Sequence, residues 1–100
     1  MSSSLLINLD GLQVQQVQQV VQARGIDKVI LAGMSANLCT QAHLYDLLEL
    51  GYEVAVVRDA TAGAKVPEGD GYLAAIINFR MVANGVWWTD DAVDRIARSA

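Results

Sequence analysis

The spacing of apolar residues in the first quarter of the chain predicts an amphipathic helix over residues 10–24. Glutamines lie opposite an apolar side formed by Leu12, Val14, Val17, Val20 and Val21. Asp10 and Gln13 have the spacing of a capping box, and Gly25 follows the last turn, as helix ends prefer. Residues 1–4 are expected to be a loose end.

Beyond Gly25, short apolar runs alternate with stretches of helical period. The runs KVILAG (28–33), EVAVVRD (53–59) and VWW (86–88) predict buried strands. Helices are predicted over 37–51, 72–85 and 89–99, and a turn-rich loop over 60–71. Strands that alternate with helices indicate a parallel sheet with right-handed crossovers.

This order of elements predicts an α/β fold. We expect a three-layer (αβα), Rossmann-like half-domain, with about three parallel strands flanked by four helices and a single domain over residues 1–100. Functional loops of such sheets lie beyond the carboxyl ends of the strands. Here they are 33–39, 59–70 and 88–90, so we expect them to open on one side of the sheet.

Composition and charge exclude several classes of protein. Hydrophobic residues make up 53% of the 100 residues and charged residues 18%, which suits a folded core. The formal net charge of −4 and the lack of a Lys/Arg cluster argue against nucleic acid and anionic membranes as partners. A single cysteine, no signal-peptide pattern and no apolar run of about 20 residues predict a cytoplasmic protein.

The one cysteine, Cys39, is placed where a predicted strand turns into a helix. Backbone N–H groups at a helix start favour a thiolate and can stabilise an oxyanion, so a reactive thiol is one interpretation. A small buried side chain is the other, because free cysteines are commonly inert core residues. The only histidine, His43, lies four residues on and predicts either a Cys–His pair or a half-buried helix residue.

Other candidate residues also have a structural interpretation. Asp59 ends the second predicted strand and either points toward Cys39 or braces the following turn, while Lys65 is expected to be solvated. Trp87 and Trp88 should face opposite sides of their strand, one toward the core and one toward a pocket or subunit contact. One Cys and one His are too few ligands for a closed metal site, and no nucleotide-binding glycine motif is present, so no cofactor is expected.

The stretch KVILAGMSANLCTQAHLYDLLELGYEVAVVRDATAG resembles the cysteine-bearing segment of the isochorismatase-like cysteine hydrolases, which include nicotinamidases and N-carbamoylsarcosine amidases. The later GDGYLAAIINFRMVANGVWWTDDAV resembles one branch of that family, so the resemblance covers about residues 10–95. It implies that Cys39 is the nucleophile, that the Met34–Ser35 peptide bond is cis, and that the backbone N–H groups of Ser35 and Cys39 form an oxyanion hole. It also implies a thioester formed on a small C–N amide-type substrate.

The family's catalytic Asp and Lys, and its metal ligands, match no position of this sequence. The resemblance therefore implies a truncated, C-terminal half of a family member, weakly active or inactive as this chain. A hydrolase completed by a missing N-terminal half is one alternative. A non-catalytic oligomeric assembly module derived from a hydrolase is another. The Lys28–Ala32 strand is expected to have an exposed edge through which copies of the chain form a homo-oligomer.

Overall fold

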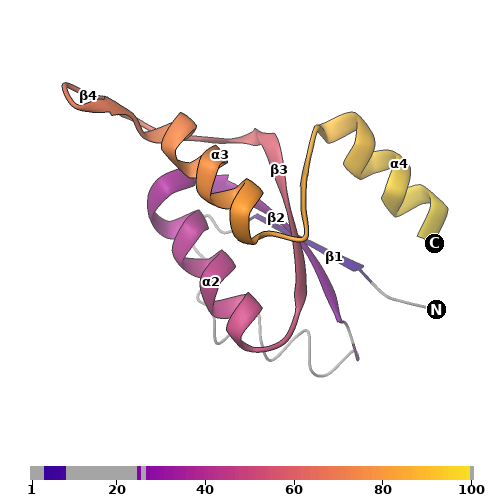
Figure 1. Cartoon of the computed structure of the whole chain (residues 1–100). Coiled ribbons are helices and arrows are strands. Elements are labelled where there is room, and N and C mark those ends of the chain that lie inside the picture. The colour runs from indigo at the N-terminus through magenta and orange to yellow at the C-terminus, as the bar shows by residue number, and fades with distance from the viewer. Residues whose placement is uncertain (1–3, 9–24, 26, 100) are drawn as a thin grey trace.

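Four parallel strands form the central sheet of the computed structural model, which describes residues 4–8, 25 and 27–99. They are β1 (Ser4–Asn8), β2 (Lys28–Met34), β3 (Glu53–Ala62) and β6 (Gly85–Trp87), and this is also their order in the sheet (Figure 1). The α/β class and the parallel sheet predicted from the sequence are confirmed. The sheet has one strand more than expected.

The additional strand, β1, corrects one premise of the sequence analysis. It pairs in parallel with β2 along five positions, from Ser4 beside Lys28 to Asn8 beside Ala32. The edge of β2 that was predicted to be exposed is therefore covered, because β1 supplies its hydrogen-bonding partner. The helix predicted over 10–24 lies outside the described residues.

Helices cover both faces of the sheet (Figure 1). A single π-helical turn, η1 (Ala36–Thr40), leads into α2 (Gln41–Glu49), and α3 (Gly71–Val82) precedes β6. Because β2, β3 and β6 are neighbours in chain order, right-handed crossovers place α2 and α3 on the same face. The last helix, α4 (Thr89–Ser99), covers the opposite face.

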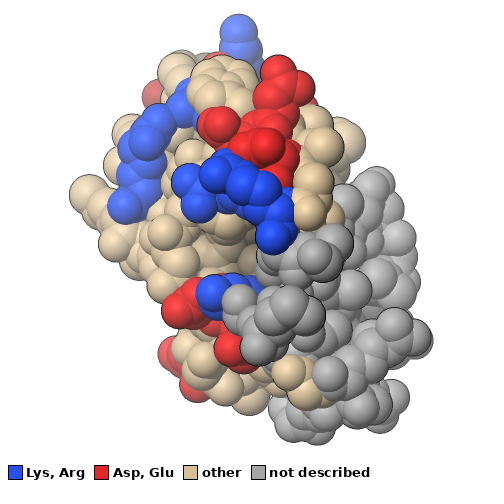
Figure 2. Space-filling view, turned by 90° about the vertical axis from the view of Figure 1, so that its right-hand side faces the viewer, with Lys and Arg blue, Asp and Glu red and all other residues tan. Residues whose placement is uncertain are grey.

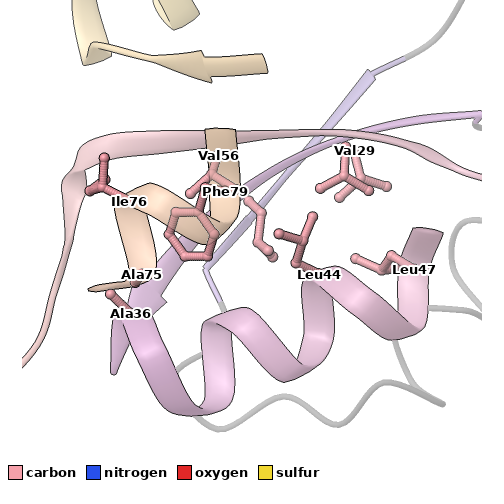
Figure 3. Packing of buried hydrophobic residues seen from close by; sticks show 10 residues of the cluster. Val29, Ala36, Leu44, Leu47, Val56, Ala75, Ile76 and Phe79 are labelled. Atoms are coloured by element: carbon pink, nitrogen blue, oxygen red, sulfur yellow. The ribbon is translucent and has the colours of Figure 1, made fainter. Parts of the chain in front are cut away.

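The larger core lies between the sheet and the pair α2 and α3 (Figure 3). Alternate strand residues point into it, since successive side chains of a strand face opposite sides. The predicted apolar side of α2 meets them through Leu44 and Leu47, both almost fully buried. The buried members of this cluster are Val29, Leu31, Ala36, Leu44, Leu47, Val54, Val56, Ala75, Ile76 and Phe79.

A smaller cluster fills the face under α4. Ile30 and Val57 of the sheet contact Ala92, and Trp87 and Ile96 pack against them. Trp87 is thus the tryptophan that packs toward a core, while Trp88 is 52% exposed. The two adjacent rings lie in different surroundings, as the alternation of strand side chains predicted.

The loop between β3 and α3 contains a short antiparallel hairpin. Its strands are β4 (Lys65–Val66) and β5 (Gly69–Asp70), and in Figure 1 the hairpin projects from the body of the molecule. Asp70 then caps α3, because its carboxylate accepts hydrogen bonds from the backbone N–H groups of Tyr72 and Leu73 at 2.9 and 3.4 Å. No helix in the described part of the chain is long and apolar enough to cross a lipid bilayer.

Candidate active site

The candidate site is the turn that joins β2 to α2 at the carboxyl end of the sheet. The peptide bond between Met34 and Ser35 is cis, at the position that the resemblance implied. The Ser35 carbonyl then accepts hydrogen bonds from the N–H groups of Leu38 and Thr40, each at 3.1 Å. These two bonds close the turn and fix the backbone on both sides of Cys39.

Cys39 is exposed near the end of this turn. It precedes α2 by two residues, within the π-helical turn rather than within an α-helical first turn as the sequence suggested. The thiol is therefore not a small core filler. Ala36 and Thr40 of the same turn are both fully buried. Their burial holds in place the backbone that carries the exposed thiol.

His43 contacts the backbone of the turn. Its Nδ1 lies 2.5 Å from the carbonyl oxygen of Cys39, so the ring nitrogen donates to a main-chain acceptor. The half-buried helix position matches the structural interpretation of this histidine. The hydrogen bond ties the first turn of α2 to Cys39 and engages that ring nitrogen away from the thiol.

The turn that carries Cys39, residues 35–40, is called the cysteine turn, and close packing holds it against the start of α3. A Cβ atom at Gly71 would lie 2.7 Å from the carbonyl oxygen of Ala64 and 2.8 Å from Nδ2 of Asn37. The N–H of Gly71 donates to the same Ala64 carbonyl at 2.9 Å. A glycine is thus required where the β3–α3 loop, α3 and Asn37 of the turn converge. Sequence reasoning missed this junction, for which the only sequence signal was a glycine at a helix start.

Asp59, the other candidate at this edge of the sheet, braces α4. Its Oδ1 accepts hydrogen bonds from the hydroxyl and from the backbone N–H of Thr89, both at 2.8 Å. The pKa of Asp59 is lowered, first of all by the hydrogen bond from the Thr89 hydroxyl. Desolvation, the next largest effect, opposes this lowering, while the backbone N–H groups of Thr89 and Asp59 and the charge of Arg58 add to it. Of the two predicted roles, the structure matches the bracing one.

Arg58, Trp88 and Tyr72 form a second junction beside Asp59. The Arg58 guanidinium stacks 4.3 Å from the centre of the Trp88 ring, a cation–π arrangement. The Tyr72 hydroxyl donates to the Arg58 carbonyl at 2.7 Å and so links α3 to β3. The sequence analysis did not single out Tyr72.

A lysine and a set of metal ligands are the other groups that could assist a thiol. Lys65 is largely exposed in the hairpin, as expected, and its Nζ lies 4.0 Å from a carboxylate oxygen of Asp70. In the part of the chain that the structure describes, no three His, Cys, Asp or Glu side chains gather closely enough to hold a metal ion. The side of the molecule that carries α4 shows basic and acidic groups next to one another rather than one basic field (Figure 2).

Two surface hollows lie on the α4 side of the sheet, and Cys39 lines neither of them. One is largely apolar and is lined by Ala32, Val57, Ala60, Thr89, Ala92, Val93 and Ile96. The other lies toward the amino ends of β2 and β3 and is lined by residues that include Lys28, Glu53 and Arg95.

Solved structures of several hydrolases share this fold. A cysteine hydrolase from Pseudomonas syringae pv. phaseolicola superposes with a TM-score of 0.78 at 20% identity, over 85% of this chain and 44% of that one. An isochorismatase-like hydrolase from Alkaliphilus metalliredigens gives 0.70 at 22% identity, over 81% and 43%. N-carbamoylsarcosine amidase from Thermoplasma acidophilum gives 0.62 at 29% identity, over 75% and 40%.

The chain therefore spans less than half the length of each of these three solved relatives. No curated protein matches it significantly. The isochorismatase domain family, however, matches residues 8–92, which include every strand after β1, the cysteine turn and the first residues of α4. This match, together with the shared fold, shows that the chain belongs to the isochorismatase family.

Proposed function

We propose that this chain carries the cysteine-bearing part of a hydrolase that acts on small C–N amide-type substrates, with Cys39 as the nucleophile. The observation that carries the proposal is the exposed Cys39 at the carboxyl end of β2, in a turn closed by two hydrogen bonds to the Ser35 carbonyl. Hydrolase is the activity named for the structural relatives, and this is the loop position at which parallel sheets hold their reacting groups.

The proposed reaction has two steps. The Cys39 sulfur attacks the carbonyl carbon, the C–N bond breaks, and the nitrogen leaves as ammonia or an amine after taking up the thiol proton. A thioester remains on the sulfur. Water then attacks the thioester, which releases a carboxylic acid and returns the thiol. In both steps the backbone N–H groups of Ser35 and Cys39 are proposed to stabilise the negative charge on the carbonyl oxygen.

Proton transfer is the part of the proposed reaction that the described residues support least. Asp59 is engaged by Thr89, Lys65 lies beside Asp70, and Nδ1 of His43 bonds a carbonyl. These are the acid, the lysine and the histidine that the sequence analysis singled out, and each is engaged elsewhere in the described structure. General acid–base assistance contributes about 10²–10⁴-fold to such reactions. We therefore propose that turnover by the described residues alone is slow, and that acid–base groups supplied from outside them raise it.

The second candidate function is that of a non-catalytic assembly module derived from a hydrolase. It is favoured by one observation, the exposed apolar side chains of Leu73, Ile77 and Met81 on α3. This candidate requires only a stable oligomer and makes no demand on the thiol.

Labelling of Cys39 with iodoacetamide tests the nucleophile, because the chain holds no other thiol. We expect the native protein to label faster than both the urea-unfolded protein and a free small thiol at the same pH. Slower labelling of the native protein would rule out an activated nucleophile. Mass spectrometry confirms that each labelled molecule carries a single adduct.

Ammonia release from a panel of small primary amides tests turnover. We expect slow release that Cys39→Ala abolishes, while Leu50→Ala, an exposed change at the end of α2, leaves it unaltered. Rapid labelling without any release would leave the nucleophile intact and favour the assembly module. Release that persists in Cys39→Ala would contradict the proposed role of the cysteine.

A further inference from the structure

A hollow of about 200 Å³ lies on the α4 side of the sheet, toward the amino ends of β2 and β3. It is called the amino-end hollow below. Each residue of a parallel strand advances the chain by about 3.3 Å, so about 20 Å separate Lys28, at this end of β2, from Met34 at the start of the cysteine turn. The amino-end hollow is therefore separate from the candidate active site.

The amino-end hollow has an apolar floor and a charged edge. Ile30 and Ala55 line it and are almost fully buried, at 4% and 5% exposure. Lys28, Glu53 and Arg95 also line it, and all three reach solvent. Figure 2, which views the molecule from the α4 side, shows basic side chains on both sides of a hollow in this surface.

Arg95 of α4 is held by an aromatic ring rather than by an acid. Its guanidinium carbon lies 4.4 Å from the centre of the Trp87 ring, so the flat face of the guanidinium is the part that is engaged. In the part of the chain that the structure describes, no carboxylate forms an ion pair with Arg95, whereas Arg98, on the same helix, pairs with Asp94. The N–H groups in the plane of the Arg95 guanidinium are thus left as a fork of donors.

Two more donors line the amino-end hollow. Oδ1 of Asn84 accepts a hydrogen bond from the Val54 N–H at 2.8 Å, which fixes the orientation of the side-chain amide and leaves its NH₂ group as a donor. Lys28 contributes an ammonium group, whose Nζ lies 3.8 Å from Oε2 of Glu53. The described lining therefore holds two cations and one carboxylate, which gives one net positive charge, and more donors than acceptors.

These features fit a ligand that has one negative charge and an apolar body. A carboxylate is planar and accepts two parallel hydrogen bonds from one Arg fork, with lone pairs to spare for an amide or an ammonium group. An apolar body gains contact with Ile30, Ala55 and the Trp87 ring, which a bare inorganic anion would leave uncovered. Pockets for drug-sized ligands measure about 300–1,000 Å³, so a hollow of about 200 Å³ fits a smaller molecule.

We infer that the amino-end hollow binds a small monocarboxylate with an apolar or aromatic body. The carboxylate lies at Arg95, within reach of Asn84 and Lys28, and the body lies beside Trp87 on the apolar floor. The inference does not depend on the proposed hydrolysis, because none of these residues belongs to the cysteine turn. A ligand of this size makes few contacts, so an affinity in the millimolar range is expected.

Titration of the ¹⁵N-labelled full chain with benzoate, followed by NMR, tests the site. We expect saturable shifts of the Trp87 indole N–H and of the backbone N–H groups of Ile30 and Ala55. The backbone N–H groups of the cysteine turn should keep their positions. The absence of saturable shifts around the amino-end hollow at tens of millimolar benzoate, or shifts confined to the cysteine turn, would overturn the inference.

Two matched arginine variants locate the contact. Arg95→Gln removes the fork of donors, and we expect it to raise the Kd for benzoate about fivefold or more. Arg98→Gln removes the same charge from the same helix, at a residue that is paired with Asp94, and should change the Kd by less than about twofold. Equal weakening by the two variants would show a response to overall charge alone and would overturn the inference. Far-UV circular dichroism verifies that each variant is folded.

A neutral ligand and a cysteine variant complete the test. Benzyl alcohol keeps the ring of benzoate without its charge, so we expect it to bind at least about fivefold more weakly. Equal affinity for the two compounds would overturn the carboxylate as the ligand class. Cys39→Ala should bind benzoate as tightly as the wild type, whatever the outcome of the amide-release experiment. Loss of benzoate binding in Cys39→Ala would place the ligand at the proposed active site and overturn the inference.

Discussion

Asp59 of β3 holds the first residue of α4, Thr89, through two hydrogen bonds of 2.8 Å to a single carboxylate oxygen. Thirty residues separate the two along the chain, so the helix receives its N-terminal acceptor from the sheet rather than from its own sequence. The contact fixes α4 at the carboxyl end of β3, next to the loops that carry the candidate site.

Replacing this acceptor is expected to lower stability. Asp59→Asn removes the negative charge at a helix N-terminus and weakens the two hydrogen bonds, so the thermal midpoint should fall. Glu68→Gln, the same chemical change at an exposed residue of the hairpin turn, serves as the control and should leave the midpoint nearly unchanged. A midpoint that falls equally in both variants would mean that the Asp59–Thr89 contact contributes nothing specific.

The same contact predicts a pH dependence. Because the pKa of Asp59 in the folded protein is lowered from its ordinary value of 3.8, its contribution to stability is fully present above that value. It is lost as the pH falls through the lowered folded-state pKa. The difference in urea midpoint between the wild type and Asp59→Asn should therefore be constant from pH 5 to 7 and shrink in more acidic solution. A difference that grows on acidification would contradict the assignment.

Leu44 tests the larger core. Its side chain is fully buried between α2 and the sheet, so Leu44→Ala removes apolar contacts and leaves a cavity. Changes of this kind cost about 2–5 kcal/mol of unfolding free energy. Leu50→Ala, at a residue that is 46% exposed just after α2, should cost much less. Chemical denaturation of the two variants measures the difference.

Gly71 tests the junction between the cysteine turn and α3. Gly71→Ala forces a Cβ atom against the Ala64 carbonyl and the Asn37 side chain, with an expected loss of about 1–3 kcal/mol. Since Asn37 belongs to the cysteine turn, the rate of Cys39 labelling should change as well. Ala74→Ser, which also adds one atom but at an exposed site of α3, should alter neither quantity.

Tyr72 tests the link between α3 and β3. Tyr72→Phe removes only the hydroxyl that donates to the Arg58 carbonyl, and a loss of about 0.5–1.5 kcal/mol is expected. Tyr45→Phe, a hydroxyl deletion at a partly exposed residue of α2, should stay within about 0.5 kcal/mol of the wild type in dilute solution. Equal effects in urea denaturation would remove the special role assigned to the Tyr72 bond.

Local pattern predicted most of the described fold. The Leu44 and Leu47 spacing located the buried side of α2, and the valine runs located β2 and β3, because burial alone dictates those residues. The strand Ser4–Asn8 was not predicted. Its five residues carry no decisive period, and it becomes a strand only by pairing with β2, twenty-four positions away in register.

For the candidate site, sequence and resemblance together located the turn but not its surroundings. The cis Met34–Ser35 peptide lies where the resemblance implied it, and the exposed Cys39 follows in the same continuous segment, in a π-helical turn rather than an α-helical first turn. The nucleophilic role of Cys39 stays a prediction. The contact of Asn37 with Gly71 and the hydrogen bond of Asp59 to Thr89 join segments about thirty residues apart. Such contacts depend on how the crossovers place the loops, which no local pattern encodes.

The strand order of the sheet bears on where a ligand can be enclosed. In open α/β sheets, crevices form where the strand order reverses and adjacent crossovers leave on opposite faces. The four described strands follow chain order from β1 to β6 without a reversal. Within these residues the strand order therefore provides no such crevice beside Cys39. If Cys39 acts on a substrate as proposed, these four strands alone supply no switch-point crevice that would select that substrate by its size.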